Sequence, residues 1–94
     1  MPYLGQTIMV KCKFYDFKGQ VITENLTHTI SLTDPNGVER FSSTSPTFDS
    51  ADSSFYVEIN FGSDWPTGNY KLVWKATQGS RNWVSKIAFN VESV

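Results

Sequence analysis

The chain has 94 residues, of which 39% are hydrophobic and 15% aromatic, and its formal net charge is −1. This length is enough for one domain and too short for two independent cores, so we expect residues 1–94 to form a single domain. Eight lysines and arginines stand against nine acidic residues, and this balance argues against a partner bound through a nucleic-acid phosphate backbone.

The sequence carries no signal for membrane insertion or export. No apolar run approaches the roughly 20 residues that a membrane-spanning helix needs. Residues 1–5 lack the charged and apolar regions of a signal peptide, so the chain does not take that route if Met1 is the native start. The single cysteine, Cys12, cannot form a disulfide within the chain.

Alternation of apolar and polar residues, which is typical of half-buried strands, begins at residues 7–14. A turn at 16–19 and a short edge strand at 20–22 follow. The next strand, 27–33, ends at a turn over 34–37, where proline presets φ and Asn36 and Gly37 supply left-handed conformations. Residues 38–43 form its partner strand. The inward face of these strands comprises Ile8, Val10, Cys12, Phe14, His28, Ile30 and Leu32.

The second half continues the same pattern after a polar stretch. Residues 42–54 are rich in Ser, Thr and Asp and contain at most a short strand at 47–48. Strands are expected at 55–61, 70–77 and 83–91, separated by a loop at 62–68 and a turn at 78–80. The inward residues of the last two strands are Tyr70, Leu72, Trp74, Ala76, Trp83, Ser85, Ile87, Phe89 and Val91.

About seven strands at a spacing of roughly 8–12 residues favour an all-β fold, an antiparallel β-sandwich. A small barrel is the alternative. No segment of ten or more residues shows helical periodicity with caps.

The segment Pro66-Thr67-Gly68-Asn69-Tyr70 resembles the tyrosine corner of immunoglobulin-like domains, in which the phenol bonds to nearby backbone. Leu72 stands where antibody-type domains have a cysteine. The whole chain therefore resembles disulfide-free bacterial and viral immunoglobulin-like domains. It is similar to macroglobulin-like domains of large surface proteins and to small immunoglobulin-like proteins of tailed-phage and prophage structural regions. The resemblance implies the fold and no catalytic or binding residue.

No residue set in the sequence predicts catalysis or a cofactor. His28 lies on an inward phase, where a structural histidine is expected. Cys12 lies between Val10 and Phe14, which favours an inert, buried thiol over a nucleophile. The glutamates, which are Glu24, Glu39, Glu58 and Glu92, are scattered over outward and loop positions and do not form the pair of a glycosidase. We expect the protein not to be an enzyme.

Metal binding is also not expected. One histidine and one cysteine cannot build the usual zinc site. Asp49 and Asp52, with Asp64 elsewhere, offer oxygen ligands for Ca²⁺, but aspartates in a polar loop more often stabilise turns. We favour the structural interpretation.

Two aromatic residues are candidates for an exposed contact surface. Trp65 lies in a loop before Pro66, where it either stacks on a sugar or partner side chain or plugs the end of the sandwich beside Tyr70. The plug is the favoured interpretation. Tyr56 takes an outward phase of its strand. Five lysines, at positions 11, 13, 71, 75 and 86, point outward from their strands. Solvated strand faces are the favoured interpretation, and a surface for an acidic partner is the alternative.

These observations predict a non-enzymatic interaction module that joins a protein partner in a larger assembly such as a phage virion or a cell surface. The rival hypothesis is a domain of a larger surface protein that binds carbohydrate or another surface ligand through Trp65.

Overall fold

The structure, a computed structural model, describes residues 2–94, so Met1, on which the expectation about export depends, lies outside the described residues. Within this range the chain forms nine antiparallel strands and no helix, which confirms the all-β prediction. The strands are β1 (Thr7–Cys12), β2 (Phe14–Tyr15), β3 (Val21–Ile22), β4 (Thr27–Thr33), β5 (Glu39–Ser43), β6 (Thr47–Asp49), β7 (Ser54–Asn60), β8 (Gly68–Gln78) and β9 (Arg81–Val91).

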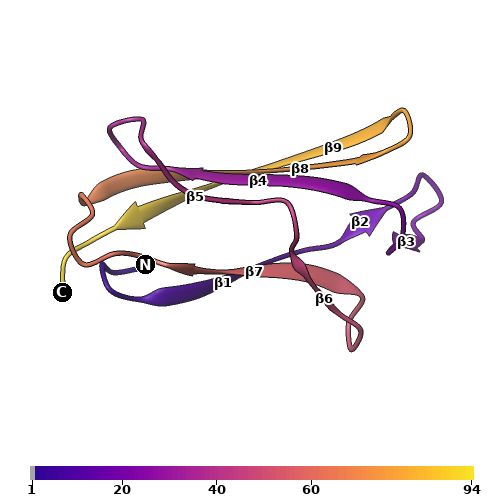
Figure 1. Ribbon diagram of the computed structural model, residues 1–94. Coiled ribbons are helices and arrows are strands. Elements are labelled where there is room, and N and C mark those ends of the chain that lie inside the picture. The colour runs from indigo at the N-terminus through magenta and orange to yellow at the C-terminus, as the bar shows by residue number, and fades with distance from the viewer. Residues whose placement is uncertain (1) are drawn as a thin grey trace.

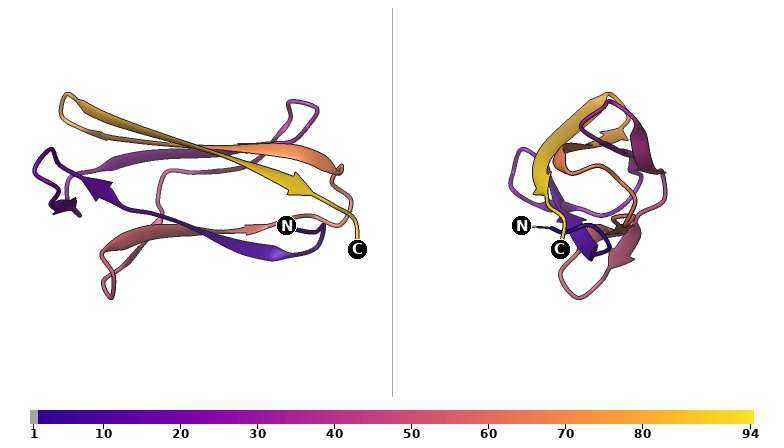
Figure 2. Two further views of the ribbon diagram at one scale, coloured as in Figure 1. Left: turned by 180° about the vertical axis from the view of Figure 1, so that it is seen from behind. Right: turned by 90° about the vertical axis from the view of Figure 1, so that its left-hand side faces the viewer.

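The strands form two facing layers with a small hairpin at one end (Figure 1). One layer is a three-stranded sheet in the order β1-β7-β6, and the other is a four-stranded sheet in the order β5-β4-β8-β9. The hairpin pairs β2 with β3 and lies at the same end of the molecule as the β8–β9 turn (Figures 1 and 2). The arrangement is consistent with the predicted sandwich.

The core lies between the layers and is centred on β4 and β8. The inward residues of β8 are at most 1% exposed, because this strand has a neighbour on both sides. Antiparallel pairing sets Ile30 opposite Trp74 and Leu32 opposite Leu72 on the buried face. Across the gap, Val57, Ile59 and Phe61 complete the core. The prediction that alternate residues of 27–33 and 70–77 are buried is therefore confirmed.

Strand boundaries differ from the prediction at the first strand. The expected strand 7–14 stops at Cys12, and Phe14 instead belongs to β2, which pairs with β3. Phe14 remains buried at 3% exposure. The prediction that the Phe14 side chain points inward was thus correct. The pairing partner, however, changes between Cys12 and Phe14, because the chain leaves the three-stranded sheet there.

Strand β9 is less buried than its pattern predicted. Ile87, on the inward phase, is 37% exposed, and Trp83 is only partly buried instead of lying in the core. Strand β9 is the edge of its sheet, so only one flank of each inward side chain has a neighbouring strand. Alternation does not show whether a strand is central or at an edge, and the edge position of β9 explains why its inward residues are more exposed than predicted.

The turn at 34–37 is organised by the side chain of Asp34. Its Oδ1 accepts the backbone N–H of Asn36 at 2.8 Å and of Val38 at 2.9 Å, and its Oδ2 accepts Arg40 Nε at 2.9 Å. Gly37 has a φ of 84°, whereas Asn36 does not share this left-handed conformation. The turn was predicted correctly, with one left-handed residue in place of two. The polar stretch 42–54 contains β6, which pairs with β7 as an edge strand.

Candidate functional site

His28 lies in a buried aromatic cluster. The indole Nε1–H of Trp74 donates a hydrogen bond to His28 Nδ1 at 3.2 Å, and the ring centroid of Phe55 lies 4.6 Å from that of the imidazole. Burial lowers the pKa of His28 and favours the neutral ring that this hydrogen bond requires. The geometry assigns His28 to the core as an acceptor for Trp74.

The other residues considered for catalysis do not gather around His28. Burial raises the pKa of the Cys12 thiol, which disfavours the reactive thiolate. No hydrogen bond joins Cys12 and His28 within residues 2–94. The glutamates at positions 24, 39, 58 and 92 are exposed and come from different elements.

Asp49 and Asp52 do come together, as a Ca²⁺ site would require, but a lysine lies against both. Lys11 Nζ lies 3.4 Å from Asp49 Oδ2 and 3.3 Å from Asp52 Oδ2. Hydrogen bonds to Asp52 and Asp49 raise the pKa of Lys11. The Ser54 hydroxyl, followed by Lys11, lowers the pKa of Asp52. Asp64 is not part of this group, and residues 2–94 hold no cluster of three such metal ligands.

Trp65 is packed on several sides at the end of the molecule opposite the β2–β3 hairpin. Its ring stacks on Tyr70 with centroids 6.2 Å apart and 19° between planes, and it meets Phe61 edge to face at 6.0 Å. The guanidinium carbon of Arg40 lies 5.6 Å from the indole centroid. A Cβ on Gly62 would lie only 2.5 Å from Trp65 Nε1. This packing fits the plug interpretation.

The corner beside Trp65 contains the predicted hydrogen bond. Tyr70, which is 0% exposed, donates its hydroxyl to the Pro66 carbonyl at 2.6 Å. Burial raises the pKa of the Tyr70 phenol, so it keeps the proton that it donates. We call Arg40, Phe61, Trp65 and Tyr70 the locked end.

Tyr56 does not join Trp65. It lies on β7 opposite Lys11 of β1 on one side and Thr47 of β6 on the other, and it is half-buried between them. Trp65 lies in the loop after the C-terminal end of β7, which is at Asn60. The two predicted contact residues therefore do not form one surface.

The most exposed aromatic residue described by the structure is Phe17, at 86%. It lies at the tip of the β2–β3 hairpin, and Lys18 Nζ lies 5.8 Å from its ring centroid. Asp16 fixes this turn, because its Oδ1 accepts the N–H of Lys18 and of Gln20, each at 2.9 Å. The Asp16 carbonyl also accepts the N–H of Gly19 at 3.0 Å. The phenyl ring is held in solvent by an ordered backbone.

A shallow hollow of about 310 Å³ separates this hairpin from the start of β9. Its lining combines aromatic rings with a cation and an amide and consists of Tyr15, Asp16, Phe17, Arg81, Asn82 and Trp83. Tyr15 is 50% exposed, and Trp83 contacts Phe14 edge to face at 6.0 Å. We call Tyr15, Phe17, Arg81 and Trp83 the open end.

The sequence contained one signal for the open end that the prediction did not use. Phe17 lies in a turn between Asp16 and Gly19, where a large apolar side chain has no strand phase and hence no predicted core to enter. Its neighbours across the hollow, Arg81 and Trp83, are more than 60 residues away in the chain. Their proximity follows from the fold alone.

Comparisons with protein-family models, curated proteins and solved structures give no match for this chain. In residues 2–94 there is no helix that could span a membrane.

Proposed function

We propose that the chain is a non-enzymatic interaction module with an immunoglobulin-like fold and that it binds a protein partner through the open end. The observation that carries this proposal is the exposed ring of Phe17 on a turn whose backbone is fixed by Asp16. Covering an apolar ring with a partner's surface removes it from water and so lowers the free energy of the complex. Because the turn is already ordered, little conformational entropy is lost on binding.

The composition of the open end supports a protein partner. Binding hot spots are enriched in Trp, Tyr and Arg, and Tyr15, Arg81 and Trp83 surround the hollow beside Phe17. The flanking Val21 is 40% exposed and lies opposite Tyr15, so it extends the apolar surface. An exposed patch of this kind on a small domain is typical of an interaction site.

The strand order and the corner support the immunoglobulin-like assignment. Hairpins β4–β5 and β8–β9 lie within the four-stranded sheet and hairpin β6–β7 within the three-stranded sheet, and the connections β5–β6 and β7–β8 cross between the layers, as in Greek-key sandwiches. The Tyr70 hydrogen bond to Pro66 at the entry to β8 is the feature by which tyrosine corners are defined. On the resemblance to small phage-encoded proteins, the larger assembly that we propose is a virion.

The test uses the proteins encoded by genes adjacent to that of the chain, each co-expressed with it and assayed by pull-down and titration. We expect one of them to bind and Phe17→Ala to weaken its binding tenfold or more. Val38→Ala is the matched control, since Val38 is 48% exposed at the opposite end. Equal binding by the Phe17→Ala variant, or equal weakening by the Val38→Ala variant, would contradict the proposal.

A glycan array separates this proposal from the carbohydrate hypothesis. Binding of a glycan that is lost in Trp65→Ala, together with no binding to any neighbouring gene product, would favour the carbohydrate hypothesis over a protein partner. The proposed protein partner predicts an array without signal.

A further inference from the structure

One flank of the sandwich lacks a covering strand. Strands β5 and β6 are joined by a short connection and lie on one flank, so β9 and β1, the other two sheet edges, lie together on the opposite flank (Figure 2). Inward side chains here are incompletely buried: Ile87 is 37% exposed, and Ile8, Cys12 and Phe89 are partly buried against the core. The equivalent residues of the central strand β8 are at most 1% exposed.

The edge of β9 already takes up one extended segment at its end. Glu92 donates its N–H to the Pro2 carbonyl at 3.2 Å, and its carbonyl accepts the N–H of Leu4 at 2.9 Å. Tyr3 and Glu92 thereby form a parallel bridge. The backbone groups of Glu92 therefore face away from β8 and pair with the N-terminal segment on that side.

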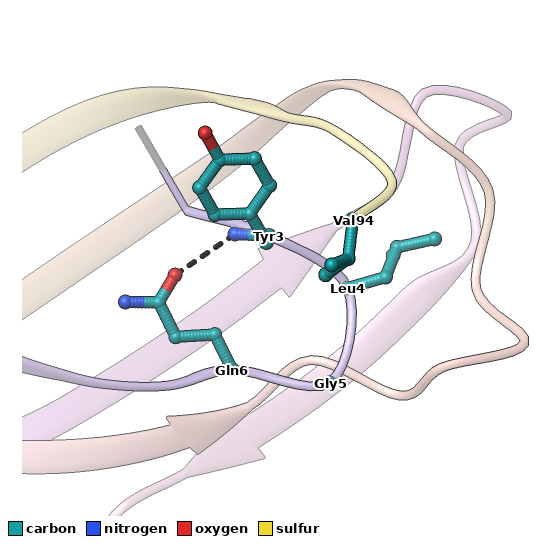
Figure 3. A pocket seen from close by; sticks show the side chains of 5 residues that line it. All are labelled: Tyr3, Leu4, Gly5, Gln6 and Val94. Carbon is teal, nitrogen blue, oxygen red and sulfur yellow. Dashed lines mark hydrogen bonds between the residues drawn. The ribbon is translucent and has the colours of Figure 1, made fainter.

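A tight turn then takes the N-terminal segment off this edge. The Gln6 side-chain oxygen accepts the Tyr3 N–H at 2.9 Å (Figure 3). Gly5, with a φ of 83°, donates its N–H to the Phe61 carbonyl. The chain enters β1 directly afterwards. The described part of the N-terminal segment consequently pairs with this flank at Glu92, directly after β9, and leaves the edge of β9 itself uncovered.

The remaining edge presents a regular row of backbone groups. Pairing of β8 with β9 runs without a register shift from Gly68–Val91 to Gln78–Arg81. In an antiparallel pair, backbone groups of alternate residues point to opposite sides of the strand. Since Glu92 points outward, the even-numbered residues 82–90 also direct their N–H and C=O groups to the free edge. Such an edge is a template for another strand.

Charge indicates what kind of strand fits. Lys71 and Lys86 both line a shallow hollow of about 370 Å³ on the outer face, beside Ile87 and Ala88. Lys86 lies opposite Val73, and Lys71 lies opposite Ala88, so the two lysine side chains project from the same outer face, Lys86 from the edge strand β9 and Lys71 from the adjacent strand β8. Among residues 2–94 the ion pairs involve Lys11 and Arg40, and neither Lys71 nor Lys86.

We propose that the free edge of β9 binds an extended segment of a partner protein in which acidic residues alternate with apolar ones. Its backbone pairs with the even-numbered residues 82–90. Its acidic side chains lie on the outer face beside Lys71 and Lys86, and its apolar side chains lie inward over Ile87 and Phe89. A second copy of this chain fits less well, because two-fold pairing of β9 strands along most of the edge brings two Lys86 ammonium groups onto the same face.

The probe is a blocked peptide of about nine residues in which glutamate alternates with valine, a length within the usual range for strands. In titrations followed by amide NMR and hydrogen exchange, we expect the amides of Val84, Lys86 and Ala88 to gain protection. The amides of Ser85 and Ile87, which face β8, should change little. A peptide in which lysine replaces every glutamate is the control for charge, and it should not bind.

Two variants test the two parts of the proposal. Ala88→Pro removes an edge N–H without removing a bond to β8 and should abolish binding. Lys86→Glu should weaken binding about two- to fivefold, the range of an exposed ion pair. Lys18→Glu, which makes the same charge change at the hairpin tip, should not.

Three results would overturn the proposal: no protection of the edge amides at millimolar peptide, equal binding of the lysine peptide, or a dimer in sedimentation that Ala88→Pro dissociates. The last result would identify a second copy as the occupant. Because Phe17 lies outside this edge, Phe17→Ala should leave peptide binding unchanged, and failure here would leave the proposed function of the open end untouched.

Discussion

The two ends of the sandwich differ in the packing of their loop aromatic residues: Trp65 is packed against other side chains, whereas Phe17 is exposed. At the locked end, Trp65 stacks on Tyr70, meets Phe61 edge to face and lies under the guanidinium of Arg40. At the open end, Phe17 projects from its turn with 86% of its surface exposed, and the ammonium group of the neighbouring Lys18 lies over its ring. Both residues lie in loops next to Asp and Gly or Pro, so local sequence does not separate them.

The ordered backbone has a different role at each end. In the 61–70 region, hydrogen bonds from Trp65 N–H to Gly62 and from Tyr70 to Pro66 hold a loop onto the core. In the β2–β3 turn, the Asp16 carboxylate orders the backbone, while the largest side chain of the turn, Phe17, stays exposed. Stability explains the first arrangement, and recognition is the explanation we propose for the second.

The largest effect on stability should come from removing the ring of the locked end. Trp65→Ala should lower the free energy of unfolding by about 3 kcal/mol, the lower part of the range for aromatic truncation, because Trp65 is only partly buried. Urea unfolding followed by the remaining tryptophans measures it. A loss below about 1 kcal/mol would mean that Trp65 is not a plug.

Acid should weaken the core that joins the two ends. Because the pKa of His28 is lowered in the folded protein, the unfolded chain binds more protons as pH falls through 6.5, and stability is lost. One proton can account for at most about 1.4 kcal/mol per pH unit. Melting curves between pH 7.5 and pH 5 measure the loss. His28→Gln, which keeps an acceptor for Trp74, should remove the dependence in this window, and persistence of the slope would assign it to another group.

A smaller effect is expected from the corner hydrogen bond. Tyr70→Phe removes the hydroxyl that binds the Pro66 carbonyl and keeps the ring, so unfolding should become easier by about 1 kcal/mol. Chemical denaturation gives the value. If the variant is as stable as the wild type, the corner contributes geometry without net stability.

The smallest effect on stability should come from the open end. Phe17→Ala should change the free energy of unfolding by less than about 0.5 kcal/mol, as expected for an exposed side chain. The same urea experiment as for Trp65→Ala makes the comparison direct. A loss approaching that of Trp65→Ala would show that Phe17 packs against the domain in solution.

The sequence predicted the central strands well, because burial on both sides leaves a regular pattern. Residues 27–33 coincide with β4, and the inward set of β8 is fully buried. Edges were predicted less well. The break after Cys12 and the exposure of Ile87 depend on which strand lies next to which, and alternation is the same for a central and an edge strand.

The candidate site was predicted only in part. The hydrogen bond of the Tyr70 phenol to nearby backbone was expected from a local motif, and the structure contains it. The environment of Trp65 depends on Arg40 of β5, and the hollow beside Phe17 depends on Arg81 and Trp83 of β9, all distant in sequence. A phenylalanine in the turn between Asp16 and Gly19 was the one local sequence feature that indicated the open end. Its exposure becomes clear from the fold, in which the Phe17 side chain points away from the core.

The most direct test of the difference between the ends is the affinity for one neighbouring gene product, measured by calorimetric titration with the wild type, Phe17→Ala and Val38→Ala. The proposed role of the open end predicts a loss of tenfold or more for Phe17→Ala and unchanged affinity for Val38→Ala, with both variants as stable as the wild type. Full affinity of Phe17→Ala, or a loss confined to Val38→Ala, would contradict it.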